Sequence, residues 1–436
     1  MKKYKIGVVG LWHLGEIYST GLADLGHDVL GFDENSEAVA NLNKCIPPLA
    51  EPELAKIIEK NIKRGRLYFT SSFPQIKTRD IVWLTFDTPV DGRDNVKLEP
   101  IWDFFKANAK FFKQSVLIVV SSQVPIGTCS EIKKFMIKIR PRLKFDLAYA
   151  PENLQLGRAL ESFFRPDRIV IGAQNPAVFK KIKSIFTPIK TDFLAMNMAS
   201  AELSKHALNA FLATSIGFID DISDLSRAYG ADAVDVTKAL RSDKRIGPRA
   251  YLDAGIGFSG GTLARDLKTL IKKSREARIK APLISTVFKR NNLRRNLVVK
   301  YLKKYLAASR LRGKKIAVLG LTYKPGTPTL RRAMSLEIIS KLKKAGAIIS
   351  THDPLADRAE AELLTGSKFH EDLYAAVKDS RAAVFVNNSP EFKRINFKKM
   401  KSLMKKPFIF FDTGNYFYAF EKEIKKLGFL YVGIGR

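Results

Sequence analysis

The chain has 436 residues and a formal net charge of +32 at pH 7, from 75 Lys+Arg against 43 Asp+Glu. This length predicts two to three domains rather than a single core. No apolar run reaches the ~18 residues of a membrane span, and the N-terminus MKKYKIGVVG lacks the layout of a signal peptide. With only two cysteines, Cys45 and Cys129, we expect a reduced, cytoplasmic protein without a disulfide framework.

The positive charge favours polyanionic partners, such as nucleic acid, an anionic membrane face or phosphorylated small molecules. Lysine and arginine are spread along the whole chain, and the densest segment is KRNNLRRNLVVKYLKKY at 289–305. No nucleic-acid-binding motif accompanies that segment. We therefore expect no specific nucleic-acid partner, and a nucleic-acid-binding protein with steeply salt-dependent association is the least favoured alternative.

The first 33 residues predict a β-α-β unit. KIGVVG (5–10) indicates a strand, residues 11–26 a helix, and HDVLGFD (27–33) a second strand. The turn has glycine at the first and third positions of a dinucleotide-binding turn and Trp12 at the second. The predicted cofactor-binding residues at this helix N-terminus are Gly10, Trp12, His13, Leu14 and Gly15. Asp33 is placed to accept from a ribose 2′-OH, which favours NAD over NADP. A plain β-α-β packing unit is the alternative.

Strand-like and helix-like segments then alternate to the C-terminus. The predicted strands are 80–86, 115–122, 145–150, 168–172, 314–320, 347–354, 382–388, 408–414 and 429–435. Alternation of this kind predicts parallel sheets with helices on both faces. The fold class is therefore α/β, with two Rossmann-like doubly wound domains joined by a long central helix and a helical region.

Polar residues follow three of the predicted strands in the first half of the chain. Each lies in a short proline-containing segment: Thr88-Pro89, Ser122-Gln123-Val124-Pro125 and Pro151-Glu152-Asn153-Leu154, the last of which also includes the apolar Leu154. Ligands of open α/β sheets bind beyond the carboxyl ends of strands, so these positions are site candidates. Ordinary proline-containing turns are the alternative for each.

One uninterrupted helix is predicted from about Met198 to Gly230. Its apolar residues recur at helical spacing: Leu203, Ala207, Ala210, Phe211, Thr214, Phe218, Ile222 and Leu225. A second face carries four polar residues at i, i+3, i+4 and i+7, namely Glu202, Lys205, His206 and Asn209. By itself this polar stripe reads as a solvated face, with a functional site as the alternative. The length of the helix predicts a spine between two lobes and a dimer surface.

Many motifs, in order along nearly the whole chain, resemble the UDP-glucose/GDP-mannose dehydrogenase family, the nucleotide-sugar 6-dehydrogenases. They include the segments 42–54, 86–92, 121–128, 150–172, 201–213, 241–267 and 314–331. HDP (352–354), FDTGN (411–415) and YVGIGR (431–436) follow. The resemblance implies NAD as cofactor and a homodimer. It also implies three parts: an N-terminal NAD-binding Rossmann domain (1–195), a central helical dimerisation and site region (196–304), and a C-terminal UDP-sugar-binding Rossmann-like domain (305–436).

The reaction of the family needs a nucleophile that this chain lacks. In the family, two hydride transfers to NAD oxidise a sugar CH2OH to a carboxylate, and a cysteine thiolate traps the aldehyde. The family's GFGGxCxxKD-type loop is here GFSGGTLARD (257–266), with Thr262 at the cysteine position. Three further departures accompany it: Gln123 and Leu156 replace a threonine and a glutamate that handle water, and Gly414 replaces an arginine. In the C-terminal domain, Pro328 and Thr329 also replace two aspartates.

Other positions match the family's site. The implied catalytic residues are Glu152, Lys205, Asn209, Asp266 and, at the cysteine position, Thr262. The implied substrate-binding residues are Glu152, Leu154, Lys205, Asn209, Arg245, Tyr251, Gly257, Gly260 and Lys324. No metal site is predicted. These neighbours change the reading of the polar stripe on the long helix from a solvated face to a site.

We therefore expect an NAD-dependent oxidoreductase acting on a UDP-glucose-like UDP-sugar by a single two-electron oxidation. Full 6-dehydrogenase activity by an unusual route is a minor variant of this hypothesis. The alternative is a non-catalytic homologue that binds nucleotide sugar and NAD and has a regulatory or partner role.

Overall fold

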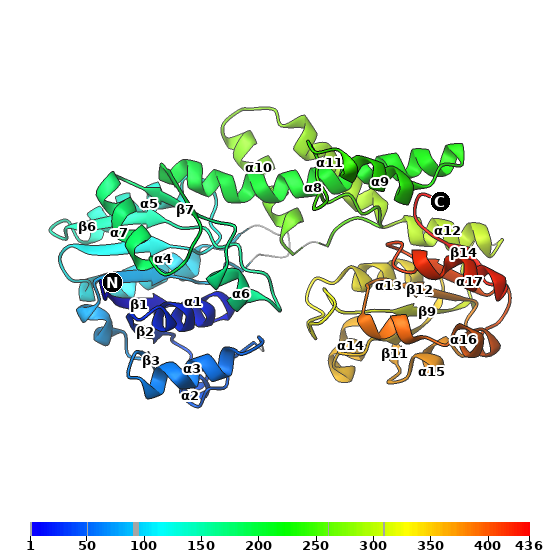
Figure 1. Ribbon diagram of the computed structural model, residues 1–436, viewed down its shortest axis with the longest axis horizontal. Coiled ribbons are helices and arrows are strands. Elements are labelled where there is room, and N and C mark those ends of the chain that lie inside the picture. Colours follow the sequence, from blue (N-terminus) through cyan, green and yellow to red (C-terminus); the bar gives the residue numbers. More distant parts are fainter. Residues whose placement is uncertain (1, 50, 90–95, 260, 308–309) are drawn as a thin grey trace. The chain divides into compact units, whose positions relative to one another are not determined.

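A computed structural model of the protein describes residues 2–49, 51–89, 96–259, 261–307 and 310–436. The chain divides into two compact units, residues 1–207 and 208–436. Each unit contains a sheet with helices on both of its faces (Figure 1). Helix α8 (Met198–Tyr229) is continuous, begins in the first unit and ends in the second. The prediction of two Rossmann-like units joined by a long helix is confirmed.

The first unit has an eight-stranded sheet in the order β3-β2-β1-β4-β5-β6-β7-β8. Its strands are β1 (Lys5–Val9), β2 (Asp28–Phe32), β3 (Leu67–Thr70), β4 (Ile81–Leu84), β5 (Val116–Val120), β6 (Phe145–Tyr149), β7 (Arg168–Ala173) and β8 (Asp192–Met196). The order reverses between β1 and β4, which makes the carboxyl ends of these two strands the ligand-binding switch point.

The prediction of a wholly parallel sheet is wrong at β6 and β7, which pair antiparallel. For two consecutive strands to pair parallel, the connection must return the chain to the end of the sheet at which the first strand began. The connection from 150 to 167 carries only the short helix α6 (Ala159–Phe164) and does not cross back. Strand β7 therefore starts at the end of the sheet where β6 finishes. Strand β8 then pairs parallel to β7.

Two apolar layers cover the first sheet, because its central strands are buried on both faces. One layer contains α1 (His13–Asp24), α2 (Ser36–Asn43), α3 (Leu54–Lys63), α6 and α7 (Pro176–Ile185). The other contains η1 (Phe73–Thr78), α4 (Glu99–Asn108), η2 (Ala109–Phe111) and α5 (Thr128–Ile139).

The second unit repeats the same strand order in six parallel strands, β11-β10-β9-β12-β13-β14. They are β9 (Lys315–Leu319), β10 (Ile348–His352), β11 (Lys368–Phe369), β12 (Ala382–Phe385), β13 (Ile409–Asp412) and β14 (Leu430–Val432). One face packs on α12 (Leu297–Tyr305), α13 (Met334–Lys344) and α14 (Arg358–Thr365). The other packs on α15 (Leu373–Val377), η3 (Pro390–Arg394), α16 (Phe397–Leu403), η4 (Tyr418–Phe420) and α17 (Glu421–Lys426). The remaining helices are α9 (Ala233–Ser242), α10 (Leu263–Glu276) and α11 (Pro282–Arg294).

Helix α8 buries its polar stripe, so the reading of that stripe as a solvated face is wrong. Glu202, Lys205, His206 and Asn209 are all buried. Glu202 accepts hydrogen bonds from the backbone N–H groups of Gly127 (2.6 Å) and Cys129 (2.7 Å). His206 Nε2 lies 2.9 Å from the carbonyl oxygen of Val124. The stripe is therefore buried with partners, as buried polar groups require.

Several apolar residues of α8 are exposed instead. They are Leu203, Phe211, Phe218, Leu225 and Tyr229, and Phe211 is 70% exposed. Their spacing of seven or eight residues from 203 to 225 places them along one side of the helix. Among the helices in the described ranges, none is long and apolar enough to cross a bilayer.

We predict that Glu202→Ala lowers the free energy of unfolding by about 3 kcal/mol, because two buried N–H groups at the start of α5 lose their acceptor. Urea denaturation followed by circular dichroism measures the change. Glu131→Ala is the matched control, since Glu131 is an exposed acid in the first turn of the same helix. A loss as large in the control would contradict a specific role for Glu202.

Candidate active site

The turn between β1 and α1 has the backbone shape that a dinucleotide-binding turn needs. Gly10 has φ +91°, a conformation that side chains disfavour. A Cβ at Gly15 would lie 1.8 Å from the carbonyl oxygen of Gly10, so only glycine fits there. Thr85 at the end of β4 donates its hydroxyl to the carbonyl groups of Val9 and Gly10, both at 2.9 Å, and so joins the two strands of the switch point.

Asp33 follows β2 and keeps acceptor capacity for a ribose. Its carboxylate accepts from the N–H groups of Leu11 (2.7 Å) and Asn35 (2.9 Å). A carboxylate has about four lone-pair sites, so two remain for ribose hydroxyl groups. Together with the glycine turn, this donor and acceptor set fits NAD.

The equivalent carboxylate of the second unit, Asp353, has no such capacity. It accepts from the N–H groups of Leu321, Thr322, Leu355 and Ala356 and from the Thr322 hydroxyl. In addition, a Cβ at Gly320 would lie 2.4 Å from the side-chain oxygen of Asn387. These groups occupy the switch point of the second sheet, so the dinucleotide-binding features belong to the first unit.

Glu51 holds several segments around the cofactor turn, and sequence reasoning missed it. Its side chain is fully buried, lies 2.8 Å from His13 Nε2, and accepts from the N–H groups of Gly157 (2.7 Å) and Ala159 (3.1 Å). It thus orients a predicted cofactor residue. The available signal was an acid directly before Pro52 in the proline-rich segment 46–54. Of the neighbouring predictions, Trp12 is 46% exposed and Leu14 packs on the core.

Glu16, one turn into α1, is a buried acid without a hydrogen-bond partner on either oxygen among the described residues. Burial, with the nearby Glu51 carboxylate, raises the pKa of Glu16 to about 8. The residue is therefore protonated at neutral pH.

The predicted strand-end residues of the first unit meet in pairs. Thr88 donates its hydroxyl to the carbonyl oxygen of Gln123 at 2.9 Å. Glu152 accepts from the Leu154 N–H at 2.6 Å. Lys205 Nζ donates to the Glu152 carbonyl oxygen at 2.5 Å and to its carboxylate at 3.2 Å. An ammonium group has three N–H donors, so one remains to polarise a substrate oxygen.

In the second unit, α10 begins within residues 257–266, the segment that matches the family's GFGGxCxxKD-type loop and that we call the predicted sugar loop. Asp266 is fully buried and accepts from the Asn209 side-chain amide at 2.5 Å. Arg265 Nε lies 3.9 Å from the other Asp266 oxygen. Asn209, Arg265 and Asp266 thus form one polar cluster at the first turn of α10, whose N-cap residue is Thr262.

The remaining predicted substrate residues differ in their surroundings. Lys324 is exposed in the turn after β9, next to Tyr323, whose ring would lie 3.3 Å from a Cβ at Gly261. Tyr251 is half exposed. Arg245 is 89% exposed and pairs with Asp243 (2.6 Å) rather than with any loop residue. The predicted residue Gly260 lies outside the described residues.

Neither cysteine replaces the missing nucleophile. Burial and then Glu202 raise the pKa of the Cys129 thiol, and Cys129 is fully buried. Burial and then Glu59 raise the pKa of the Cys45 thiol. A reactive cysteine needs a lowered pKa and access. Within the described part of the second unit, no hydrogen bond joins the Thr262 hydroxyl to a base that could activate it.

Comparison with known proteins agrees with this geometry across the whole chain. Family models match three consecutive segments: the UDP-glucose/GDP-mannose dehydrogenase NAD binding domain at residues 4–190, the central domain at 199–293 and the UDP binding domain at 317–419. The UDP-glucose 6-dehydrogenase TuaD of Bacillus subtilis is 33% identical over 435 residues, which cover 99% of this chain and 93% of the relative. The chain belongs to the UDP-glucose/GDP-mannose dehydrogenase family.

Solved structures of this family have the same fold. A UDP-glucose dehydrogenase from Pyrobaculum islandicum is similar with a TM-score of 0.90 and 28% identity, over 100% of this chain and 98% of the other. An NDP-N-acetyl-D-galactosaminuronic acid dehydrogenase from Methanosarcina mazei gives a TM-score of 0.85 and 26% identity, over 100% and 96%. The chain is thus an NAD-dependent oxidoreductase of the nucleotide-sugar dehydrogenase family, and the non-catalytic alternative is not favoured.

We predict that Glu16→Gln stabilises this dehydrogenase at alkaline pH. Because the folded protein holds the Glu16 proton up to about pH 8 and the unfolded chain releases it near the ordinary glutamate pKa of 4.5, wild-type stability falls as pH rises between these values. The variant should gain on the order of 3 kcal/mol at pH 8.5 and little below pH 4.5. Calorimetric melting from pH 4 to 9 measures the gain.

The exposed Glu37, in the first turn of α2, offers the control variant Glu37→Gln. A pH-independent difference between Glu16→Gln and wild type would show that the folded protein holds the Glu16 proton no more strongly than the unfolded chain does.

Proposed function

We propose that this dehydrogenase oxidises the CH2OH group of a UDP-glucose-like UDP-sugar once, to the aldehyde, and releases it without a second oxidation. The observation that carries the proposal is the combination of an intact Lys205–Glu152 pair and Asn209–Asp266 pair with a threonine at the thiolate position. The first pair serves alcohol oxidation. The second oxidation requires a covalent trap, for which Thr262 is a poor nucleophile.

The chemistry of the proposed step divides between the cofactor and the chain. Bound NAD supplies the hydride acceptor. Lys205 donates an N–H to the sugar oxygen and stabilises negative charge as the hydroxyl proton leaves. Glu152 holds the Lys205 ammonium through two acceptor atoms, and Asn209 and Asp266 form the polar cluster beside Thr262. We propose that these residues serve one substrate.

The substrate assignment follows the family's UDP binding domain and the relatives' names, several of which are UDP-glucose 6-dehydrogenases. The proposed sugar-side residues are Leu154, Arg245, Tyr251, Gly257, Gly260 and Lys324. The proposed cofactor-side residues are Gly10, Trp12, His13, Leu14, Gly15, Asp33, Thr88 and Gln123.

A homodimer and a cytoplasmic location are part of the proposal. The exposed apolar side of α8, with Phe211 and Phe218 near its middle, supports a second copy of the chain as its occupant. Arg245 is exposed and would be free to exchange Asp243 for a substrate of the partner copy. Two unpaired thiols support a reducing compartment.

We predict one NADH per sugar and a product lighter by two hydrogens when the protein is incubated with NAD and UDP-glucose. Thr262→Cys should add a second NADH and a gain of one oxygen, because the thiolate traps the aldehyde. Absorbance at 340 nm and mass spectrometry measure both quantities.

Thr262→Ser is the matched control for that experiment, since it keeps a hydroxyl and should stay at one NADH. Two NADH per sugar from the wild-type protein would overturn the two-electron proposal. Saturable binding of both ligands without NADH would revive the non-catalytic homologue.

We predict that the double substitution Phe211→Glu and Phe218→Glu halves the mass in solution, because two charges on α8 oppose its burial against a second copy. Light scattering after gel filtration measures the mass. Leu363→Glu, at a leucine of α14 that is 83% exposed, should leave the mass unchanged. A monomeric wild-type protein would contradict the proposal.

A further inference from the structure

The backbone from Gly255 to Phe258 is held by side chains rather than by a strand or helix partner. The Gly255 N–H donates to Asp220 at 3.1 Å, and the Gly255 carbonyl accepts from Arg294 Nε at 2.9 Å. The Phe258 N–H donates to the Asn291 side-chain oxygen at 2.8 Å. The Phe258 carbonyl accepts from the Asn291 amide at 3.0 Å. We call Asp220, Asn291 and Arg294, together with the segment Gly255–Phe258 that they hold, the loop clamp.

Asn291 determines the shape of the loop as well as its position. It is 3% exposed and uses both its donor and its acceptor on the same residue, Phe258. A Cβ at Gly257 would lie 2.4 Å from the Asn291 side-chain oxygen, and Gly257 has φ +95°. The loop therefore passes Asn291 so closely that neither a side chain at 257 nor another backbone conformation fits.

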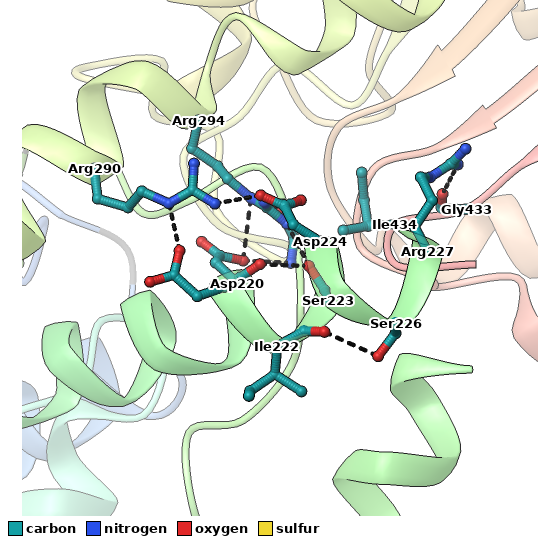
Figure 2. Close-up of polar contacts among 12 residues, drawn as sticks. Asp220, Ile222, Ser223, Asp224, Ser226, Arg227, Arg290, Arg294, Gly433 and Ile434 are labelled. Carbon is teal, nitrogen blue, oxygen red and sulfur yellow. Dashed lines mark hydrogen bonds and ion pairs between the residues drawn. The ribbon is translucent and has the colours of Figure 1, made fainter. Parts of the chain in front are cut away.

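Arg294 joins the loop to helix α8 (Figure 2). Its guanidinium is fully buried, bonds Asp224 at 2.5 Å and Ser223 at 2.5 Å, and lies 3.4 Å from Asp220. The planar fork of arginine thus contacts α8 and the loop at once, which a lysine cannot do. Because Arg294 and Asp220 are both buried, removal of the Arg294 guanidinium leaves the Asp220 carboxyl without its buried cationic neighbour.

The clamp lies directly before the residues assigned to substrate chemistry. Three residues separate Phe258 from Thr262, and the Asp266 cluster lies one turn farther along α10. Helices α10 and α11 pack on each other, so α11 supports the loop from one side and the following helix from the other. A shift at Gly255 or Phe258 therefore displaces this short segment.

We propose that Asp220, Asn291 and Arg294 are positioning residues that hold the sugar loop in its substrate-binding shape. This inference rests on the proposed function for its substrate, a nucleotide sugar. None of the three residues touches the reacting atoms. They act through the four backbone groups of Gly255 and Phe258, and their loss weakens nucleotide-sugar binding without weakening NAD binding.

Helix α11 offers a matched control one turn before Arg294. Arg290 pairs with Asp221 at 2.5 Å and also contacts Asp224, so it belongs to the same ion network (Figure 2). Among the described residues, its ion-pair partners both lie on α8, and Arg290 is partly exposed. Loss of Arg290 removes charge pairs of α8 and leaves the clamp in place.

The experiment compares Arg294→Gln and Arg290→Gln in steady-state kinetics with UDP-glucose and NAD. Arg294→Gln should raise KM for UDP-glucose about tenfold or more and leave KM for NAD within about twofold. Arg290→Gln should change neither. Equal effects of the two variants, or an equal rise in both KM values for Arg294→Gln, would overturn the proposal, because a general loss of stability does not distinguish the two ligands.

Hydrogen–deuterium exchange tests the clamp without turnover. Peptides covering 252–259 should exchange faster in Arg294→Gln than in wild type, and peptides of β1 and α1 should not change. If Arg294→Gln does not fold, Gly257→Ala disturbs the loop from its own side and should raise the same exchange and the same KM. Unchanged exchange at 252–259 in the folded variants would overturn the clamp. If wild-type protein neither binds nor oxidises UDP-glucose, the proposed function fails, and the exchange data still decide the clamp.

Discussion

Burial of polar groups along helix α8 is the constraint on which the rest of the structure depends. A charged or amide side chain that leaves water needs partners. Glu202 finds them at the start of α5, Lys205 at Glu152, and Asn209 at Asp266. Each partner belongs to a segment that follows a strand or begins a helix. Within each unit, the stripe therefore anchors such segments to α8.

Near its C-terminal end, α8 uses the same principle with opposite charges. Asp220 and Asp224 face Arg294, and the buried guanidinium extends the network to the loop before Thr262. Three residues farther along α8, Arg227 donates to the carbonyl of Gly433 at 3.0 Å (Figure 2). Its guanidinium also lies over the Tyr301 ring. Side chains thus take the place of regular secondary structure in holding the backbone of Gly255 and Phe258.

The two sheets have the same strand order and different capacities at their switch points. In the first, glycine clears the turn and Asp33 keeps lone pairs for a ribose. In the second, Asp353 is saturated and Asn387 lies against Gly320. Fold similarity alone would assign a dinucleotide to both units, whereas the count of donors and acceptors assigns it to the first.

The sequence alone determined the fold class, the family, the long helix and most strands, because these depend on local patterns: helical spacing in 198–229, apolar runs such as VLIVV, and glycine at 10 and 15. It also located the absence of a cysteine at 262. Only the tertiary structure decided that β7 runs antiparallel to β6, that the polar stripe of α8 is buried while Phe211 is exposed, and that Glu51 and Arg294 hold functional segments. The physical reason is that burial and hydrogen bonding join residues far apart in the chain. A pattern read along one segment identifies a face, and the partner that covers it is set by the packing of the whole unit.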